Sequence, residues 1–352
     1  MQPALAVAEA YRAAVPDVDV LFLGTPTGTE SRLVPAHGYR LATVTAAPFF
    51  GVGPVGRLRS ITALAAGAVQ ARRVLRAEGI ELILGLGNFA AAGAVLGARI
   101  LGLRTVIHEA NAVAGVANRL LGRLVDRVLL GFADAAPAFR PGTTLLTGTP
   151  VRAALCALAA SREARAPGAI RVLVLGGSQG SPFLNARVPE LAGRVARRGL
   201  ALEVWHQTGR GDPDPVRAAY QRKAVSARVV SSFDDVTDAY RWADVAIACA
   251  GAVTLAELAV VALPALLVPL ATAALDHQRA NARAFAAATG TWWTTEDAWD
   301  GTAVEERLAA LVASRDERRT AGARIAAAAR PEAAADVVVA CEFLLRSGAR
   351  RS

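Results

Sequence analysis

Cysteine is scarce in this chain of 352 residues, where Cys156, Cys249 and Cys341 are odd in number and far apart. A disulfide framework needs paired cysteines and a zinc site needs short cysteine spacings, so the sequence argues against both. Long hydrophobic runs are also lacking, because charged residues or glycine interrupt each apolar stretch before the roughly 20 residues that cross a membrane. No signal-peptide pattern opens the chain. We therefore expect a protein of the reducing cytoplasm.

Lysine is almost absent, and arginine carries nearly all of the formal net charge of +9. A basic balance of this size favours anionic partners such as phosphate or acidic lipid. Nucleic acid is the weakest of the anionic candidates, because no basic run is interleaved with aromatic residues and no zinc-finger spacing occurs. We therefore expect no nucleic-acid partner.

Short β-branched runs alternate with helical stretches rich in alanine, leucine and arginine. This alternation predicts an α/β fold whose parallel sheets are covered on both faces. The length suits two domains of roughly 150 residues each, and the expected strands fall into two series. The first series is 18–23, 41–44, 82–86, 105–108 and 127–130, and the second is 171–175, 202–205, 228–230, 245–248 and 265–268. Residues 132–168 are expected to connect the two domains.

Two glycine turns each follow an expected strand of the second series. Gly176–Ser181 precedes a helix that contains Asn185, and Gly251 precedes Thr254 and Glu257. Backbone N–H groups at such turns and helix starts bind anions. For the first turn, a phosphate site and an ordinary strand-to-helix turn stay open. For the second, the spacing favours a capping box, and the alternative is a diphosphate at the helix start with Glu257 accepting hydrogen bonds from ribose.

Polar residues follow two further strands. Asp276–Asn281 suits hydrogen bonding to sugar hydroxyls, with a solvated first helical turn as the alternative. His108–Asn111 ends a strand of the first series, where a histidine is expected to point into a cleft rather than into the core. Gly85–Phe89 follows the neighbouring strand and either borders the same cleft or allows close backbone packing.

Seven segments resemble, in order along the chain, motifs of the MurG family of bacterial undecaprenyldiphospho-muramoylpentapeptide β-N-acetylglucosaminyltransferases, a part of glycosyltransferase family 28. The resemblance spans nearly the whole chain. It implies the GT-B fold, in which two Rossmann-like domains face each other across a cleft. The segments are Pro3–Ala8, Phe22–Thr25, His108–Asn111, Gly148–Arg152, Gly176–Gly180, Gly251–Glu257 and Asp276–Asn281.

The resemblance also implies a role for each part of the chain. Residues 1–152 would form the domain that receives the lipid acceptor, residues 153–330 the domain that binds UDP-N-acetylglucosamine, and residues 331–352 a helix returning to the first domain. His108 and Glu109 become the catalytic candidates, with Asn111 and Asn118 on the acceptor side. The residues implied to contact the nucleotide sugar are Arg152, Ser178, Gln179, Thr254, Glu257, His277, Gln278 and Asn281.

The implied reaction is inverting, and it needs neither cofactor nor metal. The C4 hydroxyl of the muramoyl unit of lipid I attacks the anomeric carbon, and UDP leaves to give lipid II. A lipid-linked acceptor implies a peripheral protein on the cytoplasmic face of the cell membrane. Phe49, Phe50 and Val52 precede an expected helix that mixes apolar residues with arginines up to Arg76, and this helix either lies on anionic lipid or packs conventionally.

Three departures from the family pattern bear on activity. The family opens with a strand and a Gly-Gly-Thr-Gly-Gly-His loop, and Met1 falls directly after that histidine, a favoured base candidate. We therefore expect part of the site to lie outside this sequence, the first half to fold poorly and little sugar to be transferred. Asn88–Ala90 replaces a Gly-Gly-Tyr beside a serine, and Cys249 and Ala250 replace a frequent Arg-Ser pair. Another UDP-sugar glycosyltransferase or epimerase, or a non-catalytic UDP-sugar-binding remnant, stays open as an alternative.

Overall fold

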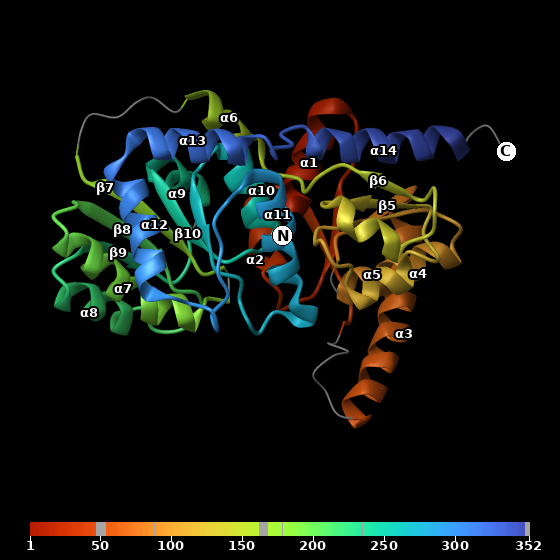
Figure 1. Cartoon of the computed structure of the whole chain (residues 1–352). Helices are drawn as coiled ribbons and strands as arrows, with labels where there is room; N and C mark the ends of the chain where they lie inside the picture. Colours follow the sequence, from red (N-terminus) through yellow and green to blue (C-terminus); the bar gives the residue numbers. More distant parts are fainter. Residues whose placement is uncertain (47–53, 88, 162–167, 178, 234, 349–352) are drawn as a thin grey trace. The chain divides into compact units, whose positions relative to one another are not determined.

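The computed structural model describes residues 1–46, 54–87, 89–161, 168–177, 179–233 and 235–348. The chain forms two compact units, each built around its own core (Figure 1). Unit 1 comprises Met1–Arg152 together with Glu332–Ser352, and unit 2 comprises Ala153–Pro331.

Unit 1 contains two parallel sheets. The first pairs β1 (Leu21–Gly24) with β2 (Arg40–Thr43). The second has the order β3-β4-β5-β6, from β3 (Leu82–Gly85), β4 (Arg104–Glu109), β5 (Arg127–Leu130) and β6 (Thr144–Leu146). The helices are α1 (Gln2–Ala14), α2 (Glu30–Ala36), α3 (Pro54–Ala77), α4 (Phe89–Ile100), α5 (Val116–Leu121), the 3₁₀ helix η1 (Ala133–Ala138) and α14 (Ala333–Gly348).

Helix α4 joins the two sheets of unit 1, because it packs against β1 as well as β3 and β4. Val44 beside the first sheet and Ile107 and Val128 in the second belong to one buried cluster. The opposite face of the second sheet is covered by α1 and α14, which bury Val7 and Val337 against it. The chain's last helix is therefore part of the core of unit 1.

Unit 2 contains one parallel sheet of the order β11-β10-β7-β8-β9. Its strands are β7 (Ile170–Leu175), β8 (Leu202–Gln207), β9 (Ser226–Val230), β10 (Val245–Ala248) and β11 (Ala265–Leu267). Its helices are α6 (Ala153–Ser161), α7 (Pro182–Arg197), α8 (Asp214–Arg222), α9 (Val236–Trp242), α10 (Ala252–Val261), η2 (Ala274–Asp276), α11 (His277–Thr289), α12 (Gly301–Ala313) and α13 (Arg315–Ala326).

Burial on both faces explains why the central strands of unit 2 read as continuous apolar runs. One face of the sheet packs against α7, α8 and α12, while α9 packs against β7. Val245 to Ala248 in β10 are all buried. Since β10 lies between β11 and β7, the loops after these three strands emerge at one edge of the sheet.

The structure confirms the predicted α/β fold with two Rossmann-like halves, and every expected strand is present, with each end within three residues of the predicted one. Residues 132–168, expected to connect the two domains, contain the division between the units after Arg152, and they also form η1, β6 and α6. Strand β6 has only three residues and pairs only with β5 at the sheet edge, so its side chains are half-buried or exposed. Such an edge strand lacks the apolar signal of a central one. Within the described ranges, none of the helices has both the length and the apolar character needed to cross a bilayer.

Candidate active site

The first glycine turn of unit 2 joins β7 to α7. Gly177 and Gly180 both have positive φ angles, of 78° and 83°, which glycine adopts without strain. Ser181 caps α7, because its hydroxyl accepts a hydrogen bond of 3.1 Å from the Leu184 N–H. Gln179 is exposed, and Ser178 lies outside the described residues. The turn therefore presents backbone N–H groups at a helix start, the arrangement that binds anions.

Backbone contact between two loops fixes the shape of this turn. A Cβ atom added at Gly180 would overlap the carbonyl oxygen of Thr208, and one added at Gly209 would overlap the backbone of Gly180. Only glycine fits at either position. The turn after β7 and the turn after β8 are thus packed together through their main chains.

A series of hydrogen bonds between buried polar side chains supports the same two turns. His206 is fully buried, with Nε2 at 3.0 Å from Asn185 Oδ1 and Nδ1 at 2.8 Å from the Tyr220 hydroxyl. Asn185 Nδ2 donates to the Thr208 carbonyl at 3.0 Å. Burial lowers the pKa of His206 to about 3, so the ring is neutral. Because the Asn185 oxygen can only accept, Nε2 carries the proton and Nδ1 accepts from Tyr220.

The second glycine turn leads into α10. Gly251 is the N-cap residue of α10, so the N–H groups of the first helical turn have no side-chain cap. Thr254 is the third residue of the helix rather than its cap, and Glu257 lies a turn further on. The capping-box interpretation is therefore wrong, because the helix begins three residues before the position that this pattern requires.

Glu257 is buried, with 7% of its surface exposed, and its Oε2 accepts a hydrogen bond of 2.9 Å from the Tyr240 hydroxyl. Tyr240 comes from α9 and is fully buried. Burial raises the pKa of Glu257 to about 7, although the hydrogen bond from Tyr240 acts in the opposite direction. Near neutral pH this carboxyl is therefore poised between its two protonation states.

The third loop, after β11, is tied to the second by side chains of α11. Gln278 Oε1 accepts from the N–H groups of Ala250 at 3.1 Å and Leu270 at 3.0 Å. Asn281, fully buried, donates to the Ala250 carbonyl at 3.1 Å. His277 is half-buried at the first position of the helix. Gln278 and Asn281, predicted to contact the sugar, thus also fix the backbone that precedes α10.

Backbone strain and a small cavity mark the start of α11. Leu275 and Asp276 both have φ angles above 50°, a conformation that costs a non-glycine residue free energy. A cavity of about 240 Å³ lies beside them, lined among others by Asp276, Arg279 and Glu296. Among the described residues, no group of three or more His, Cys, Asp or Glu side chains is arranged to hold a metal ion.

Cys249 directly follows β10, at a position where a charged residue was expected from the resemblance. It is buried, and burial raises the pKa of its thiol to about 12. The thiol is therefore neutral and offers no charge to a ligand. Any anion bound at this edge of unit 2 depends on backbone N–H groups and on neighbouring side chains.

In unit 1, His108 points into the core, and the prediction that it points away from the core is wrong. Its side chain is 3% exposed, and Nε2 lies 2.9 Å from the Gly148 carbonyl oxygen. Burial lowers the pKa of His108, which keeps the ring neutral. The carbonyl can only accept, so Nε2 carries the proton. His108 is buried although it lies near the carboxyl end of β4.

Glu109 is the centre of a hydrogen-bond cluster that shapes the loop after β4. One oxygen accepts from the Asn111 backbone at 3.0 Å and from its side-chain amide at 3.1 Å. The other accepts from Gly115 N–H and from Asn118 Nδ2, both at 2.9 Å. Asn118 also donates to the His108 carbonyl at 3.2 Å. The structure thus brings the predicted acceptor-side residues together, with the Glu109 carboxylate already holding the loop.

Arg152 lies in unit 1, where it forms an ion pair with Glu9 of α1. Its Nε and its terminal nitrogen Nη2 lie 3.1 and 2.9 Å from the same Glu9 oxygen. No local sequence pattern indicates this partner, because the two residues are 143 positions apart in the chain.

Sequence reasoning missed the contacts of three side chains that support the loops of unit 2. Tyr240 hydrogen-bonds Glu257, and His206 and Asn185 hold the first glycine turn. Asn185 was noted only as part of a helix. No local pattern marks the other two, because each of their partners comes from a different secondary-structure element.

The fold and the three clustered loops define a nucleotide-sugar enzyme of the GT-B class. Family models agree: the glycosyltransferase family 28 N-terminal domain matches residues 1–130, and its C-terminal domain matches residues 171–337. Curated relatives named UDP-N-acetylglucosamine--N-acetylmuramyl-(pentapeptide) pyrophosphoryl-undecaprenol N-acetylglucosamine transferase extend the match. The one from Acidithiobacillus ferrooxidans is 40% identical over 96% of this chain and 93% of its own. The one from Nitratidesulfovibrio vulgaris is 38% identical over 99% and 95%. The chain belongs to this MurG family.

Solved structures show the same fold. Acinetobacter baumannii MurG superposes with a TM-score of 0.74 at 26% identity, covering 97% of this chain and 95% of that one. A UDP-GlcNAc 2-epimerase from Neisseria meningitidis, bound to UDP-GlcNAc, superposes with a TM-score of 0.66 at 12% identity, covering 98% and 97%. At that identity the epimerase supports the fold alone.

Proposed function

We propose that this protein transfers N-acetylglucosamine from UDP-N-acetylglucosamine to the C4 hydroxyl of the muramoyl unit of lipid I, forming lipid II. The names of its close relatives support this reaction. The main support for the donor site is the buried Glu257, which accepts a hydrogen bond from Tyr240. Glu257 lies one helical turn beyond the uncapped start of α10. The same edge of the unit 2 sheet thus combines N–H donors for a diphosphate with a carboxylate acceptor for ribose hydroxyls.

The donor binds in unit 2. The N–H groups at the starts of α7 and α10 receive the diphosphate, and Glu257 accepts from the ribose. Gln179, Thr254 and His277 contact the nucleotide sugar from the three loops. When the acceptor oxygen attacks the anomeric carbon, the bond to the diphosphate oxygen breaks and negative charge grows on UDP. Helix starts stabilise such charge in the leaving group.

The acceptor binds on unit 1, where His108 and Glu109 act as positioning residues. Glu109 already accepts four hydrogen bonds, and His108 Nε2 is engaged with a backbone carbonyl. Both therefore hold the loop that carries Asn111, which faces the acceptor. The attacking hydroxyl still needs a base to take its proton.

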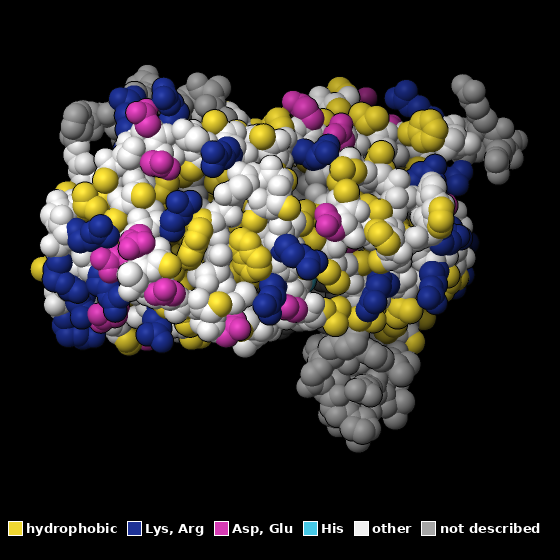
Figure 2. All heavy atoms as spheres, in the orientation of Figure 1, with side chains coloured by type: hydrophobic (Ala, Val, Ile, Leu, Met, Phe, Trp, Pro, Cys, Tyr) yellow, Lys and Arg dark blue, Asp and Glu magenta, His cyan; other side chains and the backbone are white. Residues whose placement is uncertain are grey.

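Unit 1 also docks on anionic membrane from the cytoplasmic side. Leu120 and Leu124 are 58% and 47% exposed, and the exposed Arg119 and Arg123 lie beside them at and after the end of α5. Figure 2 shows Lys and Arg side chains between hydrophobic ones over this part of unit 1. Mixed apolar and basic surfaces of this kind bind acidic lipid headgroups. The exposed arginines of α3, Arg72, Arg73 and Arg76, add positive charge, while Phe49, Phe50 and Val52 lie outside the described residues.

Two assays on the full chain test the proposal. Calorimetry with UDP-N-acetylglucosamine should show binding that EDTA leaves unchanged, and labelled sugar should appear in lipid II when lipid I is supplied. Conversion of UDP-N-acetylglucosamine to an epimerised UDP-sugar in the absence of lipid I would favour an epimerase instead. Membrane binding is tested by sedimentation with phosphatidylglycerol vesicles. Replacing Arg119 and Arg123 with Gln should weaken the free energy of vesicle binding by about 1 kcal/mol per residue. Unchanged sedimentation would reject this surface.

A further inference from the structure

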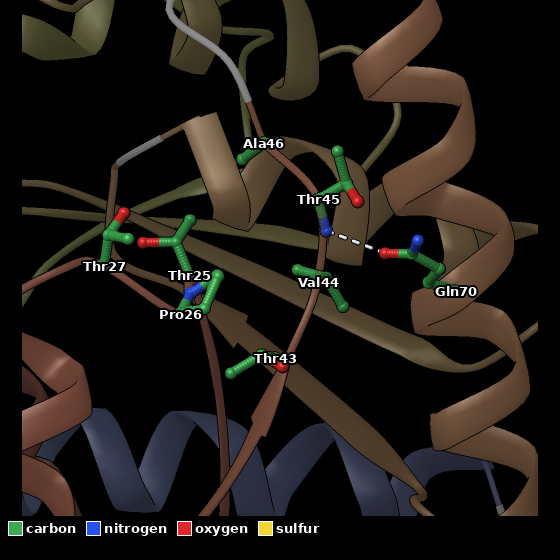
Figure 3. A pocket seen from close by; sticks show the side chains of 8 residues that line it. All are labelled: Thr25, Pro26, Thr27, Thr43, Val44, Thr45, Ala46 and Gln70. Atoms are coloured by element: carbon green, nitrogen blue, oxygen red, sulfur yellow. Dashed lines mark hydrogen bonds between the residues drawn. The ribbon is translucent and has the colours of Figure 1, made fainter.

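A polar hollow in unit 1 has no part in the contacts described so far. It is a cavity of about 460 Å³ at the carboxyl ends of β1 and β2, closed on one side by α3 (Figure 3). Ligand sites of α/β proteins occur at this end of parallel strands, and the volume falls within the range of roughly 300–1,000 Å³ typical of ligand pockets. Five polar side chains line it: Thr25, Thr27, Thr43, Thr45 and Gln70. We call these five residues the threonine pocket.

The threonine pocket offers hydrogen bonds but no charge. The residues that line it include no Asp, Glu, Lys, Arg or His. The carboxylate of Glu30 is not part of the lining, and it is engaged by Thr25: Glu30 Oε1 accepts from the Thr25 N–H at 2.8 Å and from the Thr25 hydroxyl at 2.9 Å. Burial opposes ionisation of Glu30, but the Thr25 hydrogen bonds outweigh it and lower the pKa. Glu30 therefore stays ionised and held within its own loop.

The pocket's free hydrogen-bonding capacity is large. Gln70 Oε1 accepts from the Thr45 N–H at 2.7 Å, which leaves the Gln70 NH₂ group as a donor. Thr27, Thr43 and Thr45 are exposed, and each hydroxyl both donates and accepts. In Figure 3, Thr25 and Thr27 lie on one side of the hollow and Thr45 and Gln70 on the other. A neutral ligand between them would meet donors and acceptors on both sides.

The chemistry of the relatives' acceptor selects the ligand, and this step rests on the proposed function. Their names describe three parts: an N-acetylmuramyl-pentapeptide, a pyrophosphoryl group and an undecaprenol chain. A pyrophosphoryl group is bound by cations or by backbone N–H groups at a helix start, and a polyprenyl chain requires an extended apolar wall. The lining holds four threonines, one amide and no cation, and its apolar side chains are limited to Pro26, Val44 and Ala46. Amides and sugar hydroxyls, in contrast, match its neutral donors and acceptors.

We propose that the threonine pocket binds the N-acetylmuramyl-pentapeptide part of the acceptor. The pocket would then hold the acceptor through amide and hydroxyl groups rather than through its lipid or its charge. Its residues act in acceptor binding and take no part in the bond-making step.

The test uses the full chain and its Thr43→Val/Thr45→Val double variant. Valine keeps the shape of threonine, Thr43 is the last residue of β2 and Thr45 is exposed, so the variant should fold, while two hydroxyls are lost. Soluble N-acetylmuramyl-pentapeptide, titrated by ligand-observed NMR, should bind the wild type, and the double variant should bind it about tenfold more weakly. Thr302→Val, an exposed threonine of unit 2, is the matched control and should change nothing.

Two further ligands distinguish a failure of the pocket assignment from a failure of the proposed function. Farnesyl diphosphate, which carries the lipid and diphosphate parts alone, should bind wild type and double variant equally, and so should UDP-N-acetylglucosamine. Failure of the wild type to bind the muramyl peptide, or equal binding by the double variant, would overturn the pocket assignment. If UDP-N-acetylglucosamine also failed to bind and no lipid II formed, the proposed function itself would be rejected.

Discussion

Replacing Glu257 with Gln should make the protein more stable and worse at binding its donor. The carboxyl is buried, and burial raises its pKa from the ordinary value of 4.5 to about 7. Glutamine keeps an oxygen that can accept the hydrogen bond from Tyr240, but it carries no charge. The two effects of the substitution therefore have opposite signs, and both can be measured on one variant.

The stability effect follows from the pKa. The folded pKa lies above the unfolded one, so between about pH 4.5 and 7 the folded state holds more protons than the unfolded state. The wild type should therefore lose stability as the pH rises through this window. One pKa unit corresponds to about 1.4 kcal/mol, so the loss between pH 5 and pH 8.5 amounts to roughly 2 to 3 kcal/mol. The Glu257→Gln variant should not show this loss. Any pH-independent cost of burying the amide cancels in the comparison.

The affinity effect follows from the proposed contact with ribose. A hydrogen bond to a charged acceptor contributes roughly 1.5 to 3 kcal/mol, so the variant should bind UDP-N-acetylglucosamine about 10- to 100-fold more weakly at pH 8.5. In the wild type, affinity should fall as the pH drops below about 7, where Glu257 takes up its proton.

Tryptophan fluorescence gives a clean readout of unit 2. All five tryptophans of the chain, at positions 205, 242, 292, 293 and 299, lie in that unit. Urea unfolding followed by this signal at pH 5 and pH 8.5 gives the stability difference, and calorimetry gives the affinity. An equal pH dependence in both proteins would refute the assignment of a buried, shifted carboxyl. Unchanged affinity would refute its contact with ribose and leave only a structural role.

Three further substitutions test other contacts. Tyr240→Phe removes the hydroxyl whose hydrogen bond lowers the pKa of Glu257. The pH midpoint of UDP-N-acetylglucosamine binding, measured by calorimetry between pH 6 and 9, should therefore move upward. An unmoved midpoint would contradict this. Gly180→Ala forces a Cβ atom into the facing backbone at a positive φ. It should lower the free energy of unfolding in urea by about 2 to 5 kcal/mol and weaken donor binding. Gly168→Ala, with open space around it, should have little effect. Glu109→Ala leaves four donors without their acceptor and should increase amide hydrogen exchange in the loop after β4; unchanged exchange would show that the loop holds itself.

The sequence by itself determined the fold class and the position of the loops. Continuous apolar strands such as Val245–Ala248 are buried on both faces, and this pattern can be read without knowing their neighbours. Because parallel strands end at a common edge, the turns after β7, β10 and β11 could be expected to gather there. The edge strand β6 was missed, since a strand with one neighbour and exposed side chains carries no such pattern.

Only the tertiary structure decided what the individual side chains do. Glu257 is buried because α9 places Tyr240 beside it, and the spacing within α10 alone had favoured a capping box. His108 is buried near the carboxyl end of β4, where it hydrogen-bonds a carbonyl 40 residues away in the chain. Burial, pKa and hydrogen-bond partners depend on elements that are distant in the chain. Local sequence patterns therefore located the loops, while packing between elements set the charge and orientation of the residues on them.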